Sequence, residues 1–259
     1  MTVDQAEIYL SFAAELAEEV RSLALSHFRT SLEVVQKKDE SPVTIADRLI
    51  ETRLRDRIAS RFPSNGIYGE EMGVVAGDAF TWIIDPIDGT KSFITGFPLF
   101  GTLIAVAYEN QPFCGLIDIP TTRERWTGRP QRATFGEQRA TTSDCKRVGD
   151  ARFYTTSPDM FRGSDAERFE KLSRSARLRR FGGDCYMYGL LASGHCDLIL
   201  ECGLQPYDYM AIVPIVQGAG GVMTDWNGKP LSIGSTGHVL ASATQELHEE
   251  ALNLIHSNM

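Results

Sequence analysis

The sequence predicts an α+β protein built from stacked layers of helices and strands. Three observations support this class: two amphipathic helices open the chain, short strands fill its middle, and helices and strands alternate after residue 150. Elements of this kind stack because each apolar face must be covered by another element. The stretch 139–150, rich in arginine, threonine and serine, divides the pattern, so we expect two halves, 1–145 and 146–259, that form one folded unit.

Apolar residues at helical spacing predict the two N-terminal helices. The first covers 4–29, with an apolar side made of Ile8, Phe12, Leu16, Val20 and Leu23. The second follows Pro42 and stops at the turn 63–66, with an apolar side made of Ile45, Leu49, Leu54, Ile58 and Phe62. A short strand is expected at 34–38. The polar content of 30–42 is compatible with a mobile lid or with a loop that moves without a function.

Short apolar runs and turn residues predict strands in the rest of the N-terminal half. We expect them at 67–70, 80–84, 102–108, 113–118 and 124–127, with a hairpin turn at 135–138. In the C-terminal half, strands are expected at 151–155, 178–181, 196–201, 221–224 and 237–241. They alternate with helices at 164–176, 184–193, 207–218 and 245–256.

Composition and charge restrict the function classes. The 259 residues carry a formal net charge of −8, which argues against a general nucleic-acid binder because such proteins need a basic face. Five cysteines without a Cys-x-x-Cys pair argue against a zinc site or a disulfide framework, and they fit reduced thiols in a cytoplasm. The N-terminus has no basic leader and no apolar run reaches about 18 residues, so we expect no signal peptide and no membrane span.

The most informative motif is Asp85-Pro86-Ile87-Asp88-Gly89-Thr90, which follows the apolar run 82–84. Two carboxylates fixed beside a glycine turn are suited to holding hard divalent cations near a phosphate. The amides of Gly89 and Thr90 are placed to open a short helix, and such amides cradle phosphate groups. The alternative is a plain strand-end turn, because aspartate and glycine are common turn residues.

Other acidic residues have both structural and functional interpretations. Glu70 and Glu71 are neighbours on a predicted strand, so at most one of them faces the Asp85 motif. Asp208 begins a predicted helix, where it is either a cap or a further carboxylate from a distant segment. Asp47 fits a capping box that begins at Thr44. Two more acids are equally ambiguous: Asp184 follows two glycines, and Glu201 ends an apolar strand.

Taken together, these motifs resemble the inositol monophosphatase family over nearly the whole chain. The resemblance rests on the order and spacing of Gly69-Glu70-Glu71, residues 85–90, Tyr207-Asp208-Tyr209-Met210-Ala211 and Gly218-Ala219-Gly220-Gly221. Within the family, residues 182–186, 192–197, Glu201 and 204–209 are most similar to the histidinol-phosphate phosphatase branch. One departure is Tyr207, since inositol phosphatases typically have tryptophan before the aspartate that is Asp208 here.

The resemblance implies a layered α-β-α-β-α fold, a homodimer, and two or three Mg²⁺ ions per active site. It implies that the metal ligands are Glu70, Asp85, the Ile87 carbonyl, Asp88 and Asp208. Phosphate would be bound by Asp88, Gly89 and Thr90. Thr90, assisted by Asp47 or Glu70, would orient the attacking water, and the rest of the substrate would contact Gly183, Asp184 and Glu201.

The expected activity is therefore Mg²⁺-dependent hydrolysis of a small phosphomonoester, with L-histidinol phosphate, a compound of histidine biosynthesis, as the preferred substrate. Its ammonium and imidazole groups suit Asp184 and Glu201. In this hypothesis 1–145 carries the metal and phosphate motifs, and 146–259 carries the substrate pocket and the last metal ligand. The alternatives are an inositol-1-monophosphatase, a broader sugar or nucleotide phosphatase, and a binding protein that keeps the scaffold. We expect no nucleic-acid or membrane partner and a cytoplasmic location.

Overall fold

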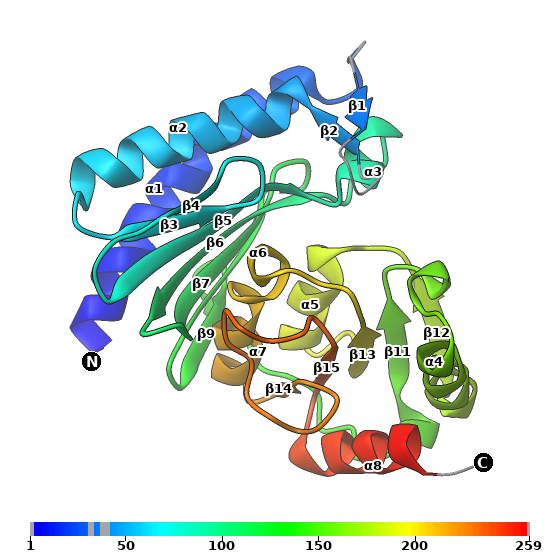
Figure 1. The fold of residues 1–259 in the computed structure, drawn as a ribbon. Coiled ribbons are helices and arrows are strands. Elements are labelled where there is room, and N and C mark those ends of the chain that lie inside the picture. The colour runs from blue at the N-terminus through cyan, green and yellow to red at the C-terminus, as the bar shows by residue number, and fades with distance from the viewer. Residues whose placement is uncertain (1–2, 31–33, 37–41, 258–259) are drawn as a thin grey trace.

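The computed structural model describes residues 3–30, 34–36 and 42–257. The candidate lid, 30–42, lies mostly outside the described residues. Two sheets and three helical layers form the body of the molecule (Figure 1). The order of layers is α-β-α-β-α, which confirms the predicted fold class.

The larger sheet has eight strands and belongs to the N-terminal half. Its strand pairs are antiparallel except for the parallel pair β3–β5. The spatial order is β10 (Gln138–Arg139), β9 (Arg132–Phe135), β8 (Glu124–Arg129), β7 (Gln111–Ile119), β6 (Gly101–Tyr108), β5 (Phe80–Asp88), β3 (Gly66–Gly69) and β4 (Gly73–Val75). Helices α1 (Val3–His27) and α2 (Ile45–Arg61) cover its outer face, and β1 (Val34–Gln36) pairs with β2 (Pro42–Thr44) beside them.

The smaller sheet has five strands and belongs to the C-terminal half. Its order is β12 (Leu178–Phe181), β11 (Arg152–Thr155), β13 (Leu198–Glu201), β15 (Val239–Ser242) and β14 (Val222–Thr224). Between the two sheets lie α5 (Cys185–Ala192), α6 (Pro206–Tyr209) and α7 (Ile212–Gly218). The outer layer contains α4 (Ser164–Ser175) and α8 (Gln245–His256), and short helices occur at α3 (Thr90–Ile94), η1 (Val148–Asp150) and η2 (Pro158–Met160).

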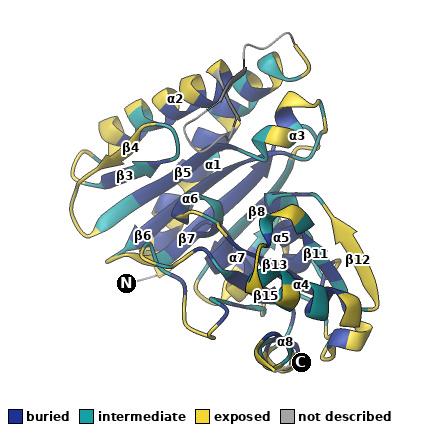
Figure 2. Ribbon diagram, turned by 45° about the vertical axis from the view of Figure 1, so that its right-hand side comes forward, coloured by how far each residue is buried: buried dark blue, intermediate teal, exposed yellow. Residues whose placement is uncertain are grey.

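The alternation of side chains along single strands explains the layering. On β6, Leu103 and Ala105 pack in the core that contains α5 and α7, whereas Ile104 and Val106 pack in the core that contains α1 and α2. On β13, Ile199 faces the middle layer, and its neighbours Leu198 and Leu200 face α4 and α8. Burial therefore follows the layers, and the outer sides of α1 and α2 are exposed (Figure 2).

Several expected details of the helices and strands are wrong. Ile8, Ile45 and Leu49 are 55%, 57% and 42% exposed. The buried side of α2 is one position further round, with Ala46, Ile50, Leu54 and Ile58. Asp47 and Glu51 are also buried there, which conceals the amphipathic pattern because polar residues occupy the inner face.

The remaining differences concern element boundaries. Strand β4 was not expected, and the single helix expected at 207–218 is two helices, α6 and α7. The hairpin turn predicted at 135–138 joins β9 to β10. Glu70 follows β3 and lies in the turn before β4, not on a strand. Among the described residues, no helix combines the length and apolar character that a membrane crossing requires.

Candidate metal and phosphate site

A bulge at the end of β5 brings two aspartates to the same side of the sheet. The β5–β6 register is regular up to Asp85 opposite Leu103, and it resumes at Asp88 opposite Gly101, so β5 has one extra residue. Side chains three positions apart on a regular strand would point to opposite faces. The extra residue cancels this alternation.

Local hydrogen bonds hold the bulge. Pro86 has no amide hydrogen, and its carbonyl accepts a hydrogen bond from the Thr102 hydroxyl at 2.9 Å. The Ile87 amide donates to Asp85 Oδ1 at 3.0 Å. The backbone groups released from the β5–β6 ladder are therefore satisfied next to the carboxylate.

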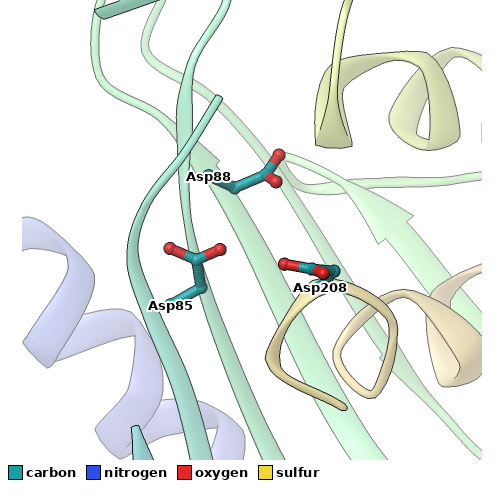
Figure 3. Close-up of side chains that lie close together, drawn as sticks. All are labelled: Asp85, Asp88 and Asp208. Atoms are coloured by element: carbon teal, nitrogen blue, oxygen red, sulfur yellow. The ribbon is translucent and has the colours of Figure 1, made fainter. Parts of the chain in front are cut away.

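Asp208 approaches the same point from the C-terminal half. It lies in α6, and its Oδ2 accepts a hydrogen bond from the Gln205 amide at 2.6 Å, so the capping interpretation of this residue is correct. The same side chain also faces Asp85 and Asp88, and the three residues offer carboxylate oxygens within 4.8 Å of one another (Figure 3). Asp208 thus both caps a helix and takes part in the acidic cluster.

The cluster makes ionisation of its carboxyl groups unfavourable. Burial raises the pKa of Asp85 well above its ordinary value, and the carboxylates of Glu70, Asp88 and Asp208 raise it further. Burial and the Asp88 carboxylate likewise raise the pKa of Asp208 well above its ordinary value. Burial, followed by the charge of Asp184, raises the pKa of Asp88 to about 8. Bound cations would reverse these shifts, because positive charge favours the ionised form.

The Gly89-Thr90 turn follows the cluster directly. Gly89 has φ 82° and precedes α3, which begins at Thr90. A Cβ atom at Gly89 would lie 2.8 Å from Asp184 Oδ2, so both the backbone conformation and the space require glycine. The Thr90 hydroxyl donates to the Ile87 carbonyl at 3.2 Å.

Two further acids surround the cavity beside the cluster. This cavity, of about 150 Å³, is lined by Asp88, Asp184, Glu201 and Asp208 together with neutral side chains. Asp184 accepts a hydrogen bond from the Ser92 hydroxyl at 2.9 Å and has φ 46°, an uncommon conformation for aspartate. Burial raises the pKa of Asp184 above its ordinary value.

Glu201 is buried and has two donors of its own. The Tyr188 hydroxyl donates to its Oε2 at 2.7 Å, and the Thr156 amide donates to its Oε1 at 3.1 Å. Burial raises the pKa of Glu201 to about 7, although both hydrogen bonds oppose the shift.

The structure brings most of the predicted residues together. Glu70 adjoins Asp85, and Gly183, with φ 125°, precedes Asp184 in the loop before α5. Asp47 is fully buried in the first turn of α2, and its part in a water relay stays a prediction.

Four contributors were missed in the sequence: Ser92, Tyr188, the Thr156 amide and the Cys185 amide, which donates to Asp88 Oδ2 at 2.5 Å. None lies in a motif with its partner, so no signal along the chain identifies them.

Comparisons with known proteins show what the chain is similar to. Residues 5–259 match the model of the inositol monophosphatase family. The chain is 41% identical over 248 residues to the bifunctional phosphatase IMPL2, chloroplastic, of Arabidopsis thaliana, covering 92% of this chain and 72% of that protein. It is 35% identical over 237 residues to the histidinol-phosphatase of Chlorobaculum parvum, covering 90% and 92% of the two chains. A solved structure of an inositol monophosphatase from Zymomonas mobilis superposes with a TM-score of 0.90 at 39% identity, covering 99% and 100% of the two chains.

Proposed function

Because this chain belongs to the inositol monophosphatase family of phosphatases, we propose that it is a Mg²⁺-dependent phosphomonoesterase whose preferred substrate is L-histidinol phosphate. The observation that carries the proposal is the convergence of Asp85, Asp88 and Asp208 beside a cavity whose lining also includes Asp184 and Glu201. The first group suits metal and phosphate, and the second suits a cationic alcohol.

The chemistry of the donors fits a hard divalent cation. Carboxylate oxygens and the Ile87 carbonyl are the ligands that Mg²⁺ prefers. Burial raises the pKa of the Cys185 thiol well above its ordinary value, so this sulfur stays protonated and the ionised donors are all oxygens. Glu70, Asp85, Asp88 and Asp208 together supply a formal charge of −4, which two Mg²⁺ ions would neutralise.

Bound Mg²⁺ supplies neutralisation of the phosphate charge and a lower pKa of the attacking water. The protein supplies positioning, which is the main requirement of phosphoryl transfer. The amides of Gly89 and Thr90 would bind phosphate oxygens, and Thr90 would orient the water. The Thr90 hydroxyl is too weak an acid to act alone, so Asp47 or Glu70 would accept a proton or a hydrogen bond from it.

Asp184 and Glu201, the acids beyond the proposed phosphate position, favour a substrate whose alcohol part carries a positive charge. An ammonium or imidazolium group would form charge-assisted hydrogen bonds with Asp184 and Glu201, each contributing roughly 1.5–3 kcal/mol. The histidinol-phosphatase among the relatives points the same way. Inositol is neutral, and carboxylates also accept hydrogen bonds from its hydroxyls, so inositol 1-phosphate is the second candidate, supported by the Zymomonas mobilis structure.

Steady-state kinetics on the two phosphates tests the proposal. We expect kcat/KM for L-histidinol phosphate to exceed that for inositol 1-phosphate by at least about tenfold, because one charge-assisted hydrogen bond contributes about that factor. Equal kcat/KM values, or a higher value for inositol 1-phosphate, would contradict the substrate assignment but not the proposed phosphatase activity. Failure to release phosphate from either substrate in saturating Mg²⁺ would contradict the enzymatic proposal as a whole.

A further inference from the structure

Glu51 is a fully buried carboxylate on α2 that lies outside the acidic cluster. Its Oε2 accepts a hydrogen bond from the Glu71 amide at 2.7 Å, and its Oε1 accepts one from the Met72 amide at 2.9 Å. The Arg55 guanidinium, one helical turn later, donates to Oε1 at 2.8 Å. A buried charge is tolerated only when it is paired and hydrogen-bonded in this way.

All the groups that bind Glu51 are connected with one short turn. The two amides belong to this turn, and the Arg55 side chain also binds its end. The residues of this turn, 70–72, join β3 to β4. Arg55 also donates to the Gly73 carbonyl, so the ion pair of α2 contacts both sides of the turn. A Cβ atom at Gly69 would lie 2.2 Å from Glu51 Oε1, which means that glycine is required for the carboxylate to reach the turn.

Glu70 is the residue whose position this arrangement fixes. Its own amide donates to the Ile84 carbonyl at 3.3 Å, next to Asp85. The residue before it is in close contact with Glu51, and the amide of the residue after it is bound by Glu51. The Glu70 carboxylate adjoins Asp85 in the cluster.

We propose that Glu51 is a positioning residue that holds the Glu70 carboxylate at the metal site, an inference that rests on the proposed role of Glu70 as a metal ligand. The pair of amides from Glu71 and Met72 requires an acceptor with two oxygens. Glutamine has one acceptor oxygen, and its NH₂ group would face an amide donor. Substitution therefore loosens the turn, and the loss is transmitted to the metal site through Glu70.

Metal binding to the purified protein, measured by isothermal titration with Mn²⁺ and with Mg²⁺, tests the proposal without reference to turnover. We expect Glu51→Gln to weaken metal binding by about 10–100-fold, the range for groups that orient metal ligands. Turnover at saturating Mg²⁺ should stay within a few-fold of the unsubstituted enzyme. Metal affinity within twofold of the unsubstituted protein would overturn the proposal.

A matched control separates positioning from loss of stability. Asp197 is also a buried carboxylate that accepts hydrogen bonds from a backbone amide and an arginine side chain, both of Arg152. It precedes β13, at the opposite end of the strand from Glu201. Asp197→Asn should lower thermal stability to a similar extent and leave metal affinity unchanged. Equal weakening of metal binding in both variants would assign the effect to general destabilisation and overturn the proposal.

A double-mutant cycle distinguishes failure of this inference from failure of the proposed function. If Glu51 acts through Glu70, Glu51→Gln should have no further effect on metal affinity in a Glu70→Gln protein. Unchanged affinity in Glu70→Gln alone would refute the ligand role of Glu70, whereas additive effects would refute only the positioning role of Glu51. If Glu51→Gln is insoluble, Arg55→Gln takes its place in the cycle, with a smaller weakening expected and the same contradictory outcomes.

Discussion

The acidic side chains around the cavity form two groups that are held differently. The inner group, Asp85, Asp88 and Asp208, consists of carboxylates that face one another, each with one backbone amide as a donor. The outer group, Asp184 and Glu201, is held by neutral donors from Ser92, Tyr188 and the Thr156 amide. Under the proposed function, bound cations would relieve the mutual repulsion within the inner group, whereas the outer group would depend on its hydrogen-bond donors for its geometry.

Replacing an inner carboxylate tests this contrast most strongly. We expect Asp85→Asn to lower turnover by more than about 100-fold, since groups that merely orient ligands contribute about 10–100-fold. The same change should raise the melting temperature of the metal-free protein, because it removes a carboxyl group whose ionisation burial and the neighbouring carboxylates oppose. Phosphate release and thermal unfolding in a chelator measure the two effects.

The exposed Asp56 on the same half provides the control. Asp56→Asn removes an equal charge and should leave both quantities nearly unchanged. Turnover by Asp85→Asn close to that of the unsubstituted enzyme would refute the metal role of the inner group.

The pH dependence of stability is the second test of the inner group. The folded-state pKa of Asp88 is about 8, against an ordinary value of 3.8, so the folded state holds more protons than the unfolded state between these values. The free energy of unfolding of the metal-free protein should therefore fall as the pH rises through this window. His248, with a pKa lowered by burial to about 4, acts in the opposite sense below pH 6.5, so the comparison is made between pH 6.5 and 8. Glu201 of the outer group, with a pKa raised by burial to about 7, adds to the fall in the lower part of this range.

Mg²⁺ should cancel this fall, because metal ions compete with protons for the carboxylates. At a concentration about 100 times its Kd, Mg²⁺ should stabilise the protein by about 2.7 kcal/mol. Urea unfolding at both pH values, with Mg²⁺ and with a chelator, measures the effect. Greater stability of the metal-free protein at pH 8 than at pH 6.5 would contradict the assigned repulsion.

The inner group was predictable from the sequence, whereas its supports were not. Asp85 and Asp88, in the motif 85–90, and Asp208 lie in compact motifs whose residue types suit the binding of metal and phosphate. Their convergence depends on a one-residue bulge in β5, which the sequence pattern did not predict. The layered fold followed from the alternation of helices and strands together with the family resemblance.

The supporting contacts join residues that are far apart in the chain. Ser92 and Asp184 are separated by 92 positions, and their hydrogen bond depends on how the two halves pack. Glu51 could not be recognised, because a glutamate among the polar residues of a helix ordinarily faces solvent. The same buried polar residues shifted the apolar face of α2. The prediction that Ile45 and Leu49 belong to that face is therefore wrong.

The outer group is tested by Asp184→Asn. We expect kcat/KM for L-histidinol phosphate to fall about tenfold, the lower end for one charge-assisted hydrogen bond, because the amide cannot pair with a cation. The value for inositol 1-phosphate should change less, and Mn²⁺ affinity should stay the same. An equal loss for both substrates together with weaker metal binding would place Asp184 in the inner group and break the comparison.

Tyr188→Phe should have the smallest effect, and it tests whether neutral donors hold the outer group. The hydroxyl is buried and donates to Glu201, so its loss should lower the free energy of unfolding by about 1–2 kcal/mol. It should raise KM for L-histidinol phosphate a few-fold at constant kcat, because Glu201 then loses one of the two donors that orient it.

Tyr186→Phe is the matched control for this change. Tyr186 is in the same helix, its ring packs edge-on against Trp126, and its hydroxyl interacts with Glu124, outside the cavity. Its substitution should change stability by about 0.5 kcal/mol or less and leave KM unaltered. A kcat loss in Tyr188→Phe accompanied by weaker Mn²⁺ binding would mean that Glu201 supports the metal cluster, and the two groups would then act as one.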